Sequence, residues 1–270
     1  MNTLWPVALI TFKEGIRNRA LYGITLLALL FFIANFLISG MFMQEVGKVA
    51  IDIALSAVSL SGLLLVLFVG INLMAKDLDK KTIYMVLSRP ISRSQYILGK
   101  FLGMALLIIT TMVFLSVCAA LSIQLIKMVY PNYFPRFSWP MILLALSFNT
   151  LSMILLSALA FFFASFTSTS FITLVLTVIV YIIGQSLSDV KALVDAPQTV
   201  GIHVSAATVK LVQLAYYLFP NLSVFNLKIQ AAHSLFLPAS YILWTVTYGL
   251  IYTALAITGA AIIFRLREFP

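Results

Sequence analysis

The stretch that decides the fold runs from Phe137 to Ser188, FSWPMILLALSFNTLSMILLSALAFFFASFTSTSFITLVLTVIVYIIGQSLS, and contains no Lys, Arg, Asp or Glu. A helix crosses the hydrocarbon core of a bilayer with about 20 apolar residues, because its backbone groups bond to one another there. This stretch is too long for a single crossing. The small polar cluster from Ser165 to Ser170 divides it and is typical of a tight turn. The stretch therefore predicts two transmembrane helices.

The rest of the chain continues the pattern. Hydrophobic residues make up 62% of the sequence and charged residues only 9%, against about 25% charged in ordinary soluble domains. Further charge-free runs cover 20–44, 53–75, 101–126 and 229–264. The sequence predicts an all-α polytopic membrane protein whose whole length, 1–270, is a single transmembrane domain. Its six transmembrane helices are expected at about 20–43, 53–75, 98–126, 141–165, 171–188 and 240–264.

The basic residues predict the orientation of these spans. Most of them fall on the side that carries both termini and the loop between the second and third spans. Because Lys and Arg accumulate on the cytoplasmic side, we expect both termini in the cytoplasm. Residues 1–19 are expected to form an interfacial helix there, with Trp5, Leu9 and Phe12 near one face. The net charge of +9 suits anionic membrane lipids and requires no nucleic acid.

The cytoplasmic loop 76–97 contains signals for the start and the end of a short helix. Asp77 or Asp79 can cap a short helix that extends to about Leu87. Pro90 then breaks the helix, because proline disfavours helical geometry at the residue before it. Ser92 and Gln95 have the spacing of a capping box for a helix that continues into the third span. The loop is thus predicted to be a short helix hinged rigidly to a transmembrane helix.

Residues 189–239 are the only large segment expected on the outer side. Val204, Ala207, Leu211, Ala215 and Leu218 recur at helical spacing between two prolines. A structureless loop of this length would be unusual. We therefore expect one or more helices packed on the outer membrane face, either to gate an exit or to cover the bundle.

Sites for chemistry are sparse. Gly99-Lys100 is followed by Phe101, so the sequence contains no phosphate-binding loop of the Walker type. His203 and His233 have no acid or Cys at metal-ligand spacing. We expect no catalytic residue, no metal site and no cofactor in this chain, and so no enzymatic activity of its own.

The predicted spans contain mild polar residues, Asn35, Asn72, Asn149 and Gln185, and no charge well within the hydrocarbon. The polar residues could line a pathway or bond between helices. An ion-coupled carrier is disfavoured, because such carriers commonly keep ionisable residues at depth. Gly99 and Gly103 form a GxxxG pattern, which is typical of close helix packing and could also mark a dimer face.

Three short motifs in the cytoplasmic loop resemble one family. Thr82-Ile83, the run from Leu87 to Arg93 (LSRPISR) and the run from Tyr96 to Lys100 (YILGK) are similar to the loop between spans two and three of ABC-2 type transporter permeases. The basic N-terminal helix and the outer Phe219-Pro220-Asn221-Leu222 also suit the family. Many members have a Glu and a Gly-Thr pair at the start of the motif, where this chain has Asp77 and Lys81-Thr82.

The resemblance implies a permease that exports its substrate by alternating access or extrusion. Two separate cytoplasmic ABC ATPase subunits, which bind ATP and Mg²⁺, would drive it, together with a second permease as a homodimer or related heterodimer. The location would be a bacterial or archaeal cytoplasmic membrane. The loop would contain the coupling element that meets the ATPase. Carried over residue by residue, this element consists of Asp77, Lys81, Thr82, Ile83, Leu87, Arg89, Pro90 and Arg93.

Two other functions stay open at this point. The chain could be a membrane scaffold or regulatory subunit whose loop binds a cytoplasmic partner without moving a substrate. It could also be an ion-coupled secondary carrier, although the absence of charged residues in its predicted spans disfavours this function. Arg89 and Arg93 could equally bind lipid phosphates.

Overall fold

The computed structural model describes residues 4–42, 45–74, 92–135, 137–167, 169–195 and 206–266. Within these ranges the chain folds into helices, and no strand is present. The α-helices are α1 (Leu4–Ile16), α2 (Arg19–Ser39), α3 (Val46–Leu64), α6 (Arg93–Val129), α7 (Trp139–Phe166), α8 (Ser170–Asp195), α10 (Ala206–Leu218), α11 (Lys228–Ala232) and α12 (Ala239–Leu266). A π-helical stretch, η1 (Leu65–Gly70), extends α3, and two short 3₁₀ turns are η2 (Pro131–Tyr133) and η3 (Ser223–Phe225).

Six helices are long and apolar enough to cross a membrane, which confirms the predicted fold class. They extend over Arg19–Ser39, Val46–Met74, Arg93–Val129, Trp139–Phe166, Ser170–Val194 and Ala239–Leu266. Several of these helices are longer than the predicted spans. A helix can continue beyond its apolar run when the polar side chains of the extra turns reach solvent or a neighbouring segment. The second begins at Val46, close to an exposed Lys48–Glu45 ion pair of 2.8 Å.

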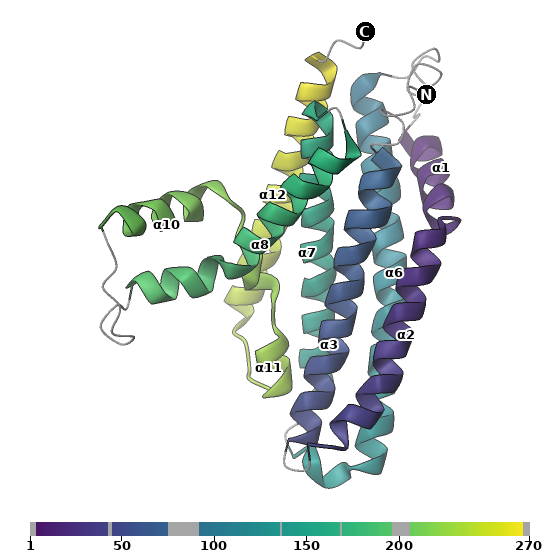
Figure 1. Cartoon of the computed structure of the whole chain (residues 1–270), viewed down its shortest axis with the longest axis vertical. Coiled ribbons are helices and arrows are strands. Elements are labelled where there is room, and N and C mark those ends of the chain that lie inside the picture. The colour runs from purple at the N-terminus through teal and green to yellow at the C-terminus, as the bar shows by residue number, and fades with distance from the viewer. Residues whose placement is uncertain are drawn as a thin grey trace.

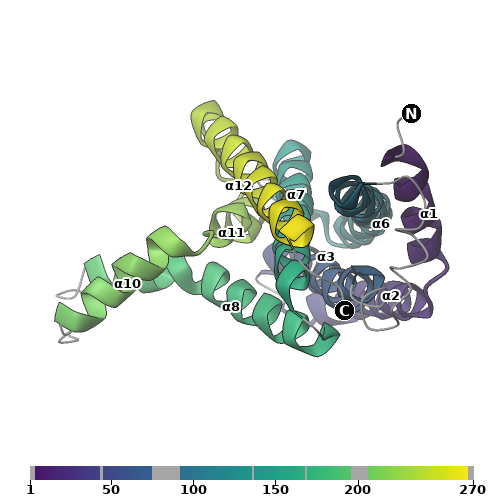
Figure 2. The ribbon, with the colours of Figure 1, turned by 90° about the horizontal axis from the view of Figure 1, so that it is seen from above.

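The spans lie side by side in one elongated bundle (Figure 1). The N-terminus, the C-terminus and both flanks of residues 75–91 lie at the same end of it. Seen along the bundle, α1 lies against α6 on one side, and α8 and α10 extend away on the other (Figure 2). The turn between α7 and α8 falls at Thr167–Thr169, within the polar cluster that predicted it.

The end of α8 and α10 together form an arm that projects sideways from the bundle (Figure 1). α10 confirms the helical spacing seen in the sequence, and α8 continues to Asp195 instead of ending near 188. The arm lies beside the bundle and does not cover the end opposite the termini. Its outward residues Leu211, Leu214 and Leu218 are exposed.

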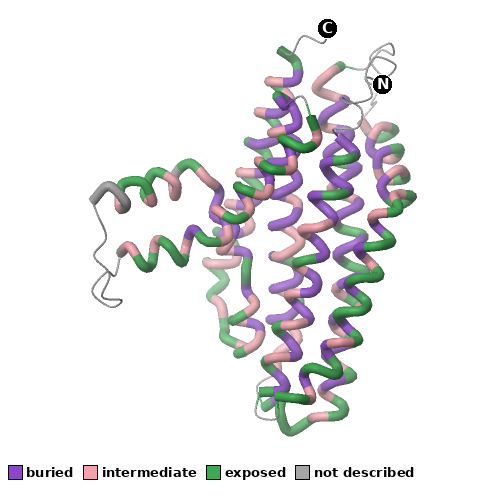
Figure 3. Tube along the Cα trace, viewed as in Figure 1, coloured by how far each residue is buried: buried purple, intermediate pink, exposed green. Residues whose placement is uncertain are grey.

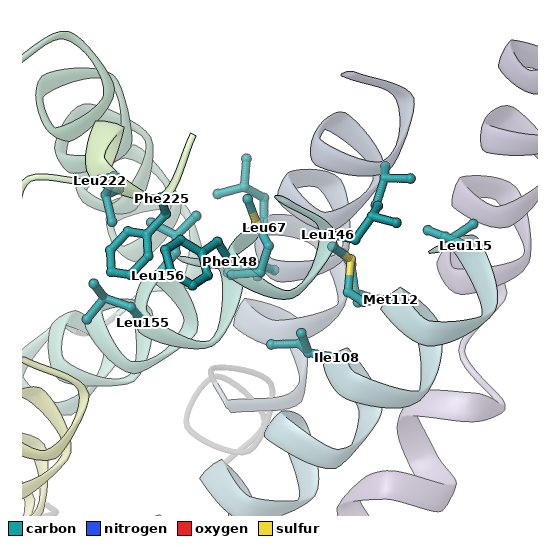
Figure 4. Packing of buried hydrophobic residues seen from close by; sticks show 14 of the residues in the cluster. Leu67, Ile108, Met112, Leu115, Leu146, Phe148, Leu155, Leu156, Leu222 and Phe225 are labelled. Carbon is teal, nitrogen blue, oxygen red and sulfur yellow. The ribbon is translucent and has the colours of Figure 1, made fainter. Parts of the chain in front are cut away.

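The spans carry apolar side chains on both faces, as membrane helices do. In α2, Leu26, Leu30 and Ile33 are exposed while Ile24 and Phe32 are buried. Buried residues follow the inward faces of the bundle (Figure 3). Near its middle, Phe148, Leu155 and Leu156 of α7 pack against Leu222 and Phe225 (Figure 4). The segment between α10 and α11 is therefore part of the core.

Candidate functional site

The predicted coupling element lies mostly outside the described residues. Asp77, Lys81, Thr82, Ile83, Leu87, Arg89 and Pro90 all fall within 75–91. Arg93 is described and is the first residue of α6, where its Nη1 donates a hydrogen bond of 3.4 Å to the carbonyl oxygen of Arg265. Arg93 therefore links the start of α6 to the end of α12.

The predicted capping box at the start of α6 is confirmed. The Ser92 hydroxyl accepts a hydrogen bond from the backbone N–H of Gln95 (3.3 Å), and the Gln95 side chain accepts one from the backbone N–H of Ser92 (3.2 Å). Both bonds satisfy donors that a helix start otherwise leaves free. The loop therefore enters a helix of 37 residues whose first turn is fixed.

Lys100 is a buried charge at the base of the loop. It is 5% exposed, and its Nζ donates to the carbonyl oxygen of Leu73 at 2.6 Å. Leu73 lies next to Met74, the last described residue of the helix that leads into the loop. The sequence analysis included Lys100 in the YILGK motif but gave it no role of its own, although its place directly before the apolar run that begins at Phe101 was a usable signal.

Aromatic packing joins the same region to α12. The rings of Tyr96 and Phe264 stack with centroids 6.0 Å apart and planes inclined by 22°. Both side chains are almost fully buried. The Lys100 ammonium lies 5.5 Å from the centre of the Tyr96 ring. The end of the span Val46–Met74, the start of α6 and the end of α12 thus form one connected group. We call this group the loop base: Leu73, Tyr96, Lys100 and Phe264.

Gly99 and Gly103 lie where α1 crosses α6. A Cβ atom on Gly103 would come within 2.5 Å of the Ala8 carbonyl oxygen, and one on Gly99 within 2.8 Å of Val7. The pair therefore allows close packing inside one chain, with α1 filling the groove that a dimer partner could otherwise use. Through this contact α1 is attached to the same end of α6 as the loop base.

Comparison with known families fits this arrangement. A family model described as "ABC-2 family transporter protein" matches residues 5–268. The chain belongs to the ABC-2 transporter family. No match was found among curated proteins. The match extends from α1 to the end of α12, so every element described above is part of the ABC-2 transporter region.

The polar residues of the ABC-2 spans differ in burial and in hydrogen-bond partners. Asn35 is fully buried, and its Nδ2 donates to the carbonyl oxygen of Ala50 (3.0 Å) in α3. The same amide contacts the Ser122 hydroxyl of α6 at 3.4 Å, so Asn35 bonds between helices. Asn72 is exposed and, among the described residues, its amide donates to the Phe68 carbonyl oxygen of its own helix (3.0 Å).

Asn149 and Gln185, by contrast, line a small cavity between α3, α7, α8 and the segment before α11. Its volume is about 20 Å³. Ser152 also lines it; this residue is 1% exposed, and its hydroxyl has no hydrogen-bond partner among the described residues. Leaving such a group unpaired costs about 1–3 kcal/mol, so a guest in the cavity would be stabilised.

Lys228, which lies in α11 outside the spans, also lines this cavity. Burial lowers the pKa of its ammonium below the ordinary value, and the carboxylate of Asp52 partly offsets that lowering. The cavity lining therefore contains a cation that is partly desolvated and only partly compensated by Asp52.

The Asn221 of the Phe-Pro-Asn-Leu motif is the centre of a polar joint beside the cavity. Its backbone N–H donates to the Tyr248 hydroxyl of α12 (2.7 Å), and its Nδ2 donates to the Ser188 hydroxyl of α8 (2.9 Å). The N–H of Leu222 donates to the Gly184 carbonyl oxygen (3.0 Å). A Cβ on Gly184 would lie 2.8 Å from the Pro220 carbonyl oxygen, so glycine permits this approach. The joint fastens α8 to α12.

Proposed function

We propose that the chain is the permease subunit of an ATP-binding cassette exporter, driven by separate cytoplasmic ATPase subunits that dock on residues 76–97. Membership of the ABC-2 family supports a transport role in the membrane. The observation that carries the coupling proposal is the bond between Lys100 and Leu73, because it ties together the two helices that enter and leave the loop.

The loop base would convert a displacement of the loop into a movement of spans. Tyr96 and Phe264 connect α6 to α12, and Arg93 adds a second contact between the same helices. α1 packs on α6 at Gly99 and Gly103, so it would move with them. A force applied at 76–97 would therefore reach three spans and the N-terminal helix rather than only one.

Both termini and the loop are proposed to face the cytoplasm, where ATP and Mg²⁺ would be bound by the ATPase partner. The termini and the described flanks of the loop lie at one end of the bundle, consistent with the distribution of Lys and Arg along the sequence (Figure 1). A second permease copy, identical or related, is proposed to complete the translocation path. Export is the direction that members of this family usually take.

The test is to co-express the chain with the ATPase that co-purifies with it and to measure ATP hydrolysis in lipid nanodiscs. Ile83→Asp and Arg89→Glu should abolish the stimulation of hydrolysis by the permease while the complex stays assembled on gel filtration. Arg17→Glu is the matched control, since Arg17 is exposed near the start of α2 and outside the loop. It should leave stimulation unchanged.

Full stimulation in both loop variants would refute the coupling role of 76–97. A complex that assembles but shows no stimulation even with the unaltered chain would instead identify a scaffold subunit. Full stimulation of hydrolysis in wild type together with its loss in the loop variants would distinguish the permease from both alternatives.

A further inference from the structure

One face of the first half of α12 carries a row of aromatic side chains. Tyr241, Trp244, Tyr248 and Tyr252 follow one another at spacings of three and four residues, which places them on one side of a helix. Together with Tyr216 of α10 they line a groove of about 450 Å³. Pockets that hold small molecules have volumes of about 300–1,000 Å³, so this groove has room for a small ligand.

The groove is open and is not part of the packed core. The Trp244 side chain is 74% exposed, and the four tyrosines are partly exposed. α12 packs on α7 through other residues, such as Gly249 against Leu151. Tyr and Trp favour the boundary between the apolar bilayer and the lipid headgroups. A row of this kind at the start of a span is therefore expected at the level of the headgroups.

The polar groups around the groove are already bonded inside the protein. The Tyr248 hydroxyl accepts the backbone N–H of Asn221 (2.7 Å), and the Tyr241 hydroxyl donates to the Val224 carbonyl oxygen (2.8 Å). The side-chain amide of Asn221 donates to the Ser188 hydroxyl. These bonds hold the rings in place, so the main surface that the groove presents to a ligand is the faces of its rings.

Ring faces without neighbouring charges favour one chemical class of ligand. No Lys, Arg, Asp or Glu is among the described residues that line the groove. The face of an aromatic ring has a negative potential and attracts a cation. A quaternary ammonium group has no N–H and loses no hydrogen bond when it leaves water. A sugar, a phosphate or a primary amine would lose hydrogen bonds to water that the bonded groups of the groove do not replace.

The protein itself places a cation on one of these rings. The Lys191 ammonium lies 3.8 Å from the centre of the Tyr216 ring, although Lys191 does not line the groove. Its charge would repel a second cation close to Tyr216. The ligand is therefore expected at the rings of α12, where the centroids of Tyr248 and Tyr252 lie 4.7 Å apart.

We propose that this groove binds a quaternary ammonium group, carried either by a soluble cation or by the choline headgroup of a lipid. The charged nitrogen would lie within about 6 Å of the ring centres of Trp244, Tyr248 and Tyr252. Because Tyr248 also bonds to Asn221, the cation would lie beside the joint that fastens α8 to α12. This binding goes beyond the coupling of ATP hydrolysis to transport and requires no ATPase.

The test measures the fluorescence of Trp244 in the full chain in dodecyl maltoside micelles. The other two tryptophans are removed by Trp5→Phe and Trp139→Phe. Choline chloride should change the emission saturably, whereas potassium chloride at equal concentration should not. The neutral isostere of choline, with a carbon atom in place of the charged nitrogen, should bind at least about tenfold more weakly.

Variants separate the ring from the hydroxyl group. Tyr252→Leu removes a ring but keeps an apolar side chain, and it should weaken choline binding at least about fivefold. Tyr252→Phe keeps the ring and should bind like the wild type. Tyr22→Leu, at an exposed position of α2 outside the groove, is the matched control and should change nothing.

Lys191→Met provides a variant whose expected effect no folding defect can produce. It removes a positive charge beside the groove and should tighten choline binding. Weaker binding in this variant would contradict a cationic ligand at the rings of α12.

The same titration in phosphatidylcholine nanodiscs distinguishes the two sources of the ligand. An affinity equal to that in micelles would identify a soluble cation, and loss of the choline response there would identify the lipid headgroup. The proposal would be overturned by equal affinities for choline and its neutral isostere, by the absence of a saturable response in micelles, or by unchanged binding in Tyr252→Leu. Because no ATPase is present, the outcome is independent of the coupling role of 76–97.

Discussion

The ammonium of Lys100 lies 2.6 Å from the backbone carbonyl oxygen of Leu73, on the far side of a loop that separates them in sequence. The bond joins the described segments on either side of residues 75–91. It places a positive charge on a carbonyl oxygen in the last described turn of the helix that precedes the loop. It also fixes α6 against that helix, so the two flanks of the loop cannot separate without breaking a charged hydrogen bond.

Lys100→Met should therefore destabilise the protein. The substitution keeps an apolar stem of similar length but leaves the Leu73 carbonyl without its charged donor, which costs about 2 kcal/mol. The midpoint of thermal unfolding in detergent micelles should fall by several degrees. Lys13→Met, which removes an exposed charge from α1, is the control and should leave the midpoint unchanged. Equal midpoints for both variants would show that the Lys100 bond contributes no stability.

Gly103→Val should detach α1 from α6. The added carbons would meet the Ala8 carbonyl oxygen and the Thr11 Cβ, and overpacking of this kind costs about 1–3 kcal/mol. Amide hydrogen exchange over Leu4–Ile16 should become faster. Gly23→Val is the matched control, because a Cβ at Gly23 in α2 would meet nothing within 4 Å. If exchange in α1 rose equally in both variants, the α1–α6 contact would not depend on Gly103.

The sequence predicted those features that depend on neighbours in the chain. Long apolar runs gave the six spans, and the spacing of Ser92 and Gln95 gave the capping box. The Lys100 bond and the cavity at Ser152 depend on residues far away in the chain, which no local pattern specifies. The extension of α8 to Asp195 was also missed, because the apolar run ends at Ser188 while α10 packs beside the later turns.

Tyr248→Phe should loosen the joint between α8 and α12. The change removes the hydroxyl that accepts the N–H of Asn221, and an unpaired buried N–H costs about 1–3 kcal/mol. The unfolding midpoint should fall, and exchange of the Asn221 amide should increase. Tyr22→Phe, which removes an exposed hydroxyl from α2, should change neither quantity. An unchanged Asn221 exchange rate in Tyr248→Phe would show that this bond does not hold the joint.

Lys228 should make the stability of the protein rise with pH in the alkaline range. Burial lowers the pKa of its ammonium in the native state, so between the native and unfolded pKa values the unfolded chain binds more protons. The free energy of unfolding then increases with pH through that interval, up to the ordinary Lys pKa of about 10.4. The free-energy cost of burying the Lys228 charge is fully present below the pKa of the native state and absent above the pKa of the unfolded state.

Lys228→Met lacks this titrating group. The amount by which its unfolding midpoint exceeds that of the wild type should therefore be larger at neutral pH than near the ordinary Lys pKa. Asp52→Asn removes the carboxylate that partly offsets the lowering of the Lys228 pKa. The stability of this variant should therefore rise more with pH than the stability of the wild type does. Lys210→Met, at an exposed position of α10, is the control and should follow the wild type throughout. A difference between Lys228→Met and wild type that stays constant over this range would mean that the Lys228 charge is not penalised by burial.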